Sequence, residues 1–146
     1  MNSEKRDFNE RNEWGGPAVE KTIKILRYEN IRCELTVIYN NYKELKELRD
    51  KDLKYGDLFI LNRFYCDVKR DKISKKSLLN FQGDFFILWR MSLEECIVIK
   101  REDIKNLNLN NYTHLVMSGD EGFTFEQLQK LPHQTLDEFI KWLKII

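Results

Sequence analysis

The segment YGDLFILNRFYCDVKR, residues 55–70, constrains the fold of this chain more than any other part. Its apolar runs on either side of a turn-like centre are typical of a β-hairpin. Asp57 lies at the start of the first expected strand, and Asp67 and Lys69 lie within the second. An ionised aspartate inside such a strand is costly unless it is paired or binds a metal. These three residues therefore predict a metal-dependent hydrolytic centre.

The triplet Asp67-Val68-Lys69 is informative because of where it lies. An acidic residue two positions before a lysine occurs several times in this lysine-rich chain, so the pattern alone says little. This triplet lies in a strand-like run, where alternation turns Asp67 and Lys69 to the same face. The alternative is an ordinary ion pair on a solvent face, which contributes little to stability. For Asp57, the alternative is an aspartate that hydrogen-bonds nearby backbone at a turn.

The length of the hairpin loop decides whether the two carboxylates can meet. A two-residue loop would pair Asp57 with Val68 and turn Asp67 to the opposite face of the sheet. A three-residue loop over residues 61–63, or a bulge, would place Asp57 opposite Asp67. A shared metal site therefore requires the odd loop or the bulge.

An Asp at the opening of one strand, followed by Asp-x-Lys on the next, resembles the PD-(D/E)XK nuclease superfamily. Gly56-Asp57 stands where that superfamily has Pro-Asp, and Asp67 occupies its acidic position. The resemblance covers roughly residues 17–99. It implies an α/β domain with the restriction-endonuclease-like fold, which has a central mixed β-sheet flanked by helices.

The resemblance also implies a metal and a set of ligands. Mg²⁺, or Mn²⁺, would be held by Asp57, Asp67 and the backbone carbonyl of Val68. Lys69 would lie beside the attacking water and orient it or stabilise the charge on the phosphate. Glu20, on the expected first helix, would complete the metal shell. The alternative for Glu20 is a solvent-facing residue favoured near a helix start by the helix dipole.

Basic residues are concentrated between positions 63 and 76, where six of them accompany two acidic residues. Positive charge beside an acidic metal site favours contacts with a phosphate backbone. A solvated basic loop is the alternative. The residues expected to contact nucleic acid are Arg63, Arg70, Lys72, Lys75 and Lys76.

Composition sets wider bounds on the protein. A chain of 146 residues with 42% hydrophobic residues is long enough for one packed domain, expected over residues 14–146 after a polar N-terminal tail at 1–13. The net charge of +1 does not by itself indicate a nucleic-acid binder. The start has no signal-peptide core and no apolar run could span a bilayer, which predicts a cytoplasmic protein without a membrane partner. The three scattered cysteines are expected to be buried, reduced thiols.

Hydrophobic periodicity predicts a mixed order of helices and strands. Residue Ser74 is expected to cap a helix, and one of Phe123 and Phe125 is expected to be exposed at a partner surface. Beside the hairpin, helices are expected at 17–29, 74–81, 102–107, 123–131 and 135–146, and strands at 32–39, 84–89, 96–99 and 112–117. Residues 42–51 are expected to form a short surface helix or a long excursion between strands.

The expected function is that of a Mg²⁺-dependent endonuclease that hydrolyses phosphodiester bonds, with DNA as substrate and RNA as the alternative. A homodimer would let it cut both strands of a duplex. Two other functions remain open. The chain could be an inactive member of the same fold that binds nucleic acid or a protein, or an unrelated α+β interaction module whose carboxylates face opposite sides of the sheet.

Overall fold

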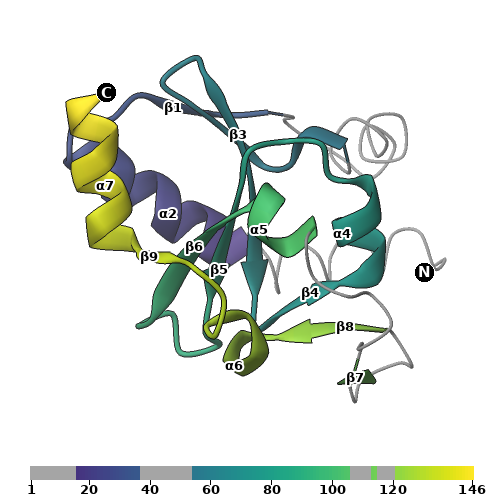
Figure 1. Ribbon diagram of the computed structural model, residues 1–146. Helices are drawn as coiled ribbons and strands as arrows, with labels where there is room; N and C mark the ends of the chain where they lie inside the picture. The colour runs from purple at the N-terminus through teal and green to yellow at the C-terminus, as the bar shows by residue number, and fades with distance from the viewer. Residues whose placement is uncertain (1–15, 37–53, 106–112, 115–120) are drawn as a thin grey trace, which may run out of the picture.

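The computed structural model describes residues 16–36, 54–105, 113–114 and 121–146. A six-stranded sheet in the order β1-β2-β3-β5-β6-β9 forms the centre (Figure 1). Strands β3 and β5 run parallel and the other neighbours run antiparallel, so the sheet is mixed. Its strands are β1 (Cys33–Leu35), β2 (Leu58–Ile60), β3 (Phe64–Arg70), β5 (Phe85–Trp89), β6 (Cys96–Lys100) and β9 (Gln134–Thr135).

A second, three-stranded sheet has the order β4-β8-β7. Its strands are β4 (Lys72–Ser74), β8 (Glu121–Thr124) and β7 (Thr113–His114). Strand β4 follows β3 after the single residue Asp71, whose φ of 67° turns the chain out of the first sheet. The Asp71 carbonyl accepts a hydrogen bond from the Phe125 N–H, which joins the two sheets at this corner.

Two helices cover one face of the six-stranded sheet. They are α2 (Gly16–Tyr28) and α7 (Leu136–Ile145), which Figure 1 shows in purple and yellow on the same side of the strands. Their buried residues pack with alternate residues of the central strands into the first core cluster. This cluster includes Ala18 and Leu26 of α2, Cys66 and Val68 of β3, Phe85, Ile87 and Trp89 of β5, and Phe139, Ile140 and Leu143 of α7.

Three shorter helices pack on the opposite face, where the second core cluster lies. They are α4 (Lys75–Asn80), α5 (Arg101–Lys105) and α6 (Phe125–Leu128). The cluster combines strand residues with residues of these helices, namely Phe86, Leu88, Ile97 and Ile99 with Leu78, Ile104, Phe125 and Leu128. Strand β5 is buried along its whole length because it is covered from both sides.

Local capping explains where several helices begin. The Ser74 side chain accepts a hydrogen bond from the Ser77 N–H at the start of α4, as expected. Thr124 and Thr135 each form a capping box, with Gln127 and Glu138 respectively, at the starts of α6 and α7.

Most of the expected elements within the described segments are confirmed, including α2, the hairpin, α4, β5, β6, α5 and α7. The expected helix at 123–131 is partly wrong, because residues 123–124 belong to β8 and the helix begins at Phe125. Phe123 and Phe125 are both buried, so the prediction that one is exposed is also wrong. The expected tail at 1–13 and helix or excursion at 42–51, with parts of three other elements, lie outside the described residues.

The three cysteines are free thiols. Cys33 and Cys66 are buried, and Cys96 is half-buried. Burial raises the pKa of each thiol above its ordinary value. They are therefore core residues with little thiolate character.

Candidate metal and phosphate site on strands β2 and β3

The hairpin between β2 and β3 has the odd loop that a shared site requires. Ile60 pairs with Phe64, which leaves residues 61–63 as a three-residue loop. Leu61 and Asn62 have φ values of 55° and 52°, and the Arg63 N–H donates to the Ile60 carbonyl at 3.0 Å. Two positive φ values in succession define a tight turn whose twist suits a hairpin. The loop therefore brings the chain before β2 alongside the middle of β3.

Asp57 is held directly against the backbone on either side of Asp67. The Asp57 N–H donates to the Cys66 carbonyl at 2.9 Å. Its carboxylate Oδ2 accepts a hydrogen bond from the Val68 N–H at 2.8 Å. These two contacts bracket Asp67 along β3, so the two aspartates lie side by side.

Gly56 makes this close approach possible. Its φ is 77°, in the region that residues with a side chain rarely adopt. A Cβ at this position would lie 2.6 Å from the Cys66 carbonyl oxygen and 2.9 Å from the Asp67 Cα. The residue is therefore more than a replacement for the proline of the superfamily motif, since proline cannot adopt a positive φ.

Asp67 and Lys69 form an ion pair on one face of β3. The distance from Lys69 Nζ to Asp67 Oδ2 is 3.3 Å; the Asp67 side chain is 9% exposed and the Lys69 side chain 31%. Asp67 pairs with Phe86 and Lys69 with Leu88, both residues of the second core cluster. Asp67 and Lys69 therefore lie on the face that α4, α5 and α6 cover, as alternation predicts.

The structure does not bring Glu20 to the carboxylates, which corrects the expected ligand set. Helix α2 packs through Ala18 and Leu26 into the first core cluster, on the face opposite Asp67. Glu20 instead forms an ion pair with Lys24 at 3.0 Å, and its side chain is 67% exposed. Two causes act together. Helical periodicity turns Glu20 away from the sheet, and α2 packs on the face of the sheet opposite Asp67. The apolar spacing of a helix does not reveal which face of a sheet the helix will cover.

The five basic residues expected to bind nucleic acid are divided by the fold. Arg63 lies in the hairpin loop, with its guanidinium 5.0 Å from the centroid of the Phe64 ring. Arg70 donates to the Met91 carbonyl at 2.7 Å and pairs with Trp89 of the first core cluster. Both are thus placed away from Asp67 and Lys69, at the hairpin tip and on the opposite face.

The other three basic residues lie close to one another in the sequence, directly after β3. Lys72 belongs to β4, and Lys75 and Lys76 are the first two residues of α4, where both are exposed. Helix α4 contacts the second core cluster, whose face of the sheet also carries Asp67 and Lys69. These lysines are therefore the better placed of the expected phosphate contacts.

The groups that could hold a metal ion here are a few oxygen atoms. Within the described segments, no group of three or more His, Cys, Asp or Glu side chains is arranged to hold a metal ion. Asp57 and Asp67 supply two carboxylates from neighbouring backbone positions, and the Val68 N–H donates to that of Asp57. Because the N–H and C=O of one residue in an extended strand point to the same edge, the Val68 carbonyl lies on the side of Asp57 as well.

Sequence reasoning gave no role to an aromatic residue beside the site, Tyr65. It precedes Asp67 by two positions on the same strand, and its ring stacks on that of Phe59 across the hairpin at a centroid distance of 4.5 Å. The signal that could have identified it is the same alternation that relates Asp67 to Lys69.

A scan of the chain against models of protein families found no match, and a search of curated proteins found none. Among the helices of the described segments, none combines the length and apolar character needed to cross a bilayer. The chemistry of the site is therefore the basis for assigning a function.

Proposed function

We propose that the protein is a Mg²⁺-dependent nuclease of the PD-(D/E)XK superfamily that hydrolyses phosphodiester bonds of DNA. One observation carries the proposal. The Asp57 carboxylate is fixed on the Val68 N–H, one residue along β3 from Asp67, whose buried carboxylate has the Lys69 ammonium at 3.3 Å. An Asp before one strand, an Asp-x-Lys on the next, and a mixed sheet with helices on both faces support the restriction-endonuclease-like fold.

The residues present fit a magnesium ion better than a zinc ion. Mg²⁺ is usually held by one or two carboxylates, with waters and substrate phosphate oxygens completing its shell, whereas structural zinc needs four protein ligands. Asp57, Asp67 and the Val68 carbonyl would hold the ion. When bound, Mg²⁺ would polarise the phosphoryl oxygen and lower the pKa of its water.

Lys69 has a specific task in this proposal. Its ammonium neutralises Asp67 in the structure described here. A divalent cation on Asp67 would take over that role and leave Lys69, which is partly exposed, to contact a phosphate oxygen or the attacking water. A positive charge at the position where negative charge develops in the transition state lowers the barrier to hydrolysis.

The test is cleavage of labelled linear, supercoiled, single-stranded and branched DNA, and of RNA, with Mg²⁺ or Mn²⁺. Asp67→Asn and Lys69→Met are expected to lose activity, by at least about a hundredfold for loss of a group that stabilises transition-state charge. Glu20→Gln is the matched control, since its carboxylate lies on the other side of the sheet, and it should cut like the wild type. Wild-type protein that cuts no substrate with either metal would refute the proposal, as would equal cutting by all three variants.

The second candidate is an inactive module of the same fold that binds nucleic acid or a protein. It is favoured by the absence of Glu20 from the site, which leaves two carboxylates, and by the ion pair that already neutralises one of them. Titration with Mg²⁺ in a calorimeter separates the two. Binding that is lost in Asp67→Asn supports the nuclease, and no binding supports the inactive module.

A further inference from the structure

A row of three aromatic rings lies beside the candidate site on the same part of the hairpin. The ring of Tyr65 stacks on Phe59, with an interplanar angle of 25° and a centroid distance of 4.5 Å. The centroids of the Tyr65 and Tyr55 rings are 5.0 Å apart. The ammonium of Lys54 lies 5.4 Å from the centroid of the Tyr55 ring. We call Tyr55, Phe59 and Tyr65 the aromatic row.

Among the described residues, the aromatic row lies outside both core clusters. All three residues are half-buried, and within the described segments none belongs to either core cluster. Helices α4, α5 and α6 pack over Phe86 and Ile99 on the β5 and β6 half of their face, whereas Phe59 and Tyr65 lie on the β2 and β3 half. Neither core cluster of the described residues therefore accounts for the three clustered rings.

The row continues directly into the charged site. Tyr65, Asp67 and Lys69 are alternate residues of one strand, so their side chains leave the same face. Their Cα atoms are spaced by about 6.6 Å per step at the usual rise of a strand. An aromatic surface, two carboxylates and an ammonium thus follow one another along the hairpin.

We infer that the aromatic row binds unpaired bases of a nucleic-acid strand whose backbone phosphate lies at Asp67 and Lys69. The placement of the phosphate at Asp67 and Lys69 rests on the proposed function, whereas the stacking of bases on the aromatic row does not. Every base has a π-face, so stacking on tyrosine and phenylalanine tolerates any sequence, and a neighbouring lysine adds attraction for the backbone. The bases of an intact duplex are stacked on one another, so the row favours single strands, frayed ends and branched DNA over duplex.

The experiment measures binding without metal, so that it does not depend on cleavage. Fluorescence anisotropy in EDTA would compare a labelled twenty-nucleotide oligothymidylate, an abasic oligomer of the same length, and the corresponding duplex. Wild-type protein should bind oligothymidylate about tenfold or more tightly than the abasic oligomer, the size expected for one or more stacked bases. In Tyr55→Leu and Phe59→Leu that preference should fall to near one, while affinity for the abasic oligomer stays the same.

Tyr28→Leu is the matched control, because Tyr28 ends α2 and is 86% exposed. Phe59 lies in β2, and its variant requires a check of folding by circular dichroism, whereas Tyr55 precedes the sheet and keeps the test valid if Phe59→Leu unfolds. Equal wild-type binding to oligothymidylate and the abasic oligomer would overturn the inference. So would no binding to any probe, or equal losses in Tyr28→Leu and Tyr55→Leu. Base-dependent binding without cleavage would instead refute only the nuclease.

Discussion

The Val68 N–H donates a hydrogen bond to the Asp57 carboxylate at 2.8 Å, so a side chain that precedes β2 occupies a hydrogen-bonding position on β3. The Asp57 N–H is in turn bound to the Cys66 carbonyl. Asp57 is thereby attached to β3 by both its backbone and its side chain. The neighbouring position of the two aspartates depends on these backbone contacts and on the absence of a Cβ at Gly56.

Gly56→Ala should destabilise the protein by about 2 kcal/mol or more, because a Cβ would meet the Cys66 carbonyl and the φ of 77° disfavours alanine. Urea unfolding followed by circular dichroism measures the change. Gly16→Ala is the control, since a Cβ there would have no neighbour within 4 Å, and it should stay within about 0.5 kcal/mol of the wild type. Equal effects of the two variants would contradict the role given to Gly56.

Mg²⁺ should raise the thermal stability of the wild type, because an ion that binds only the folded state stabilises it. At a free concentration ten times the Kd, the gain is about 1.4 kcal/mol. Differential scanning fluorimetry should show this shift in wild type and in Glu20→Gln, and no shift in Asp57→Asn or Asp67→Asn. A shift that disappears in Glu20→Gln would mean that the carboxylate of α2 does reach the ion.

Asn62→Ala should lower the free energy of unfolding by about 1 kcal/mol, because alanine is disfavoured at a φ of 52°. Asn62→Gly should have a smaller effect, since glycine adopts this conformation freely. The comparison of the two variants by urea unfolding isolates the cost of the backbone conformation. An alanine variant as stable as the glycine variant would show that the turn does not need a residue tolerant of positive φ.

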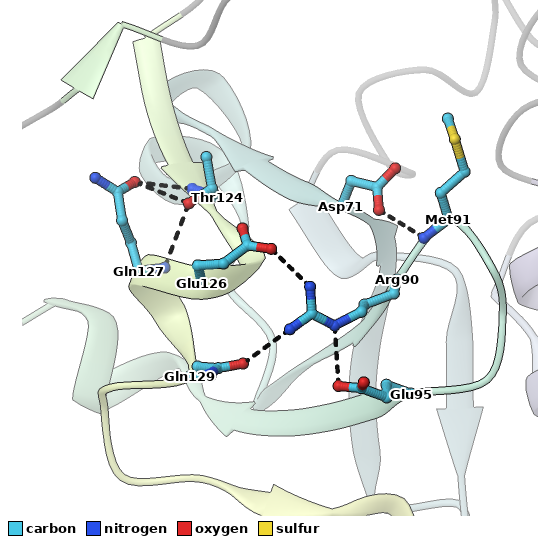
Figure 2. A network of polar contacts seen from close by, with 8 residues as sticks. All are labelled: Asp71, Arg90, Met91, Glu95, Thr124, Glu126, Gln127 and Gln129. Carbon is cyan, nitrogen blue, oxygen red and sulfur yellow. Dashed lines mark hydrogen bonds and ion pairs between the residues drawn. The ribbon is translucent and has the colours of Figure 1, made fainter.

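The carboxylate of Glu126 should make the free energy of unfolding fall at acidic pH. Figure 2 shows the Arg90 guanidinium bound to Glu126, Glu95 and Gln129. Hydrogen bonding by its own backbone N–H and then by Arg90 holds the pKa of Glu126 below its ordinary value. The stabilisation is therefore present above that ordinary value and is lost as pH falls through the lowered pKa of the folded state.

Glu126→Gln should flatten the fall in stability between about pH 5 and pH 3, because the folded and unfolded states then bind the same number of protons at this position. Urea unfolding over that range measures it. Glu94→Gln, an exposed residue of the β5–β6 turn, should keep the wild-type slope. A Glu126→Gln profile parallel to the wild type would show that the contact with Arg90 has no effect on folding.

Several parts of the fold could be predicted because their causes are local. The apolar spacing of α2 and α7, the cap at Ser74 and the apolar run of β5 each depend on residues a few positions apart. The helix expected at residues 123–131 was partly wrong for the opposite reason. Residues 122–124 pair with β4, about fifty positions earlier, and this pairing overrides their helical pattern.

The order of residues in β3 is enough to predict which groups can act together there, because alternation along a strand is a local property that turns Asp67 and Lys69 to one face. The same alternation predicts that Asp57 can join them only through an odd hairpin loop or a bulge. Three features are visible only in the folded protein: the loop has three residues, a positive φ at Gly56 brings Asp57 against β3, and α2 covers the other face, which removes Glu20 from the site. Loop conformation and the choice of face arise from packing between distant segments, and such packing leaves no periodic pattern in the chain.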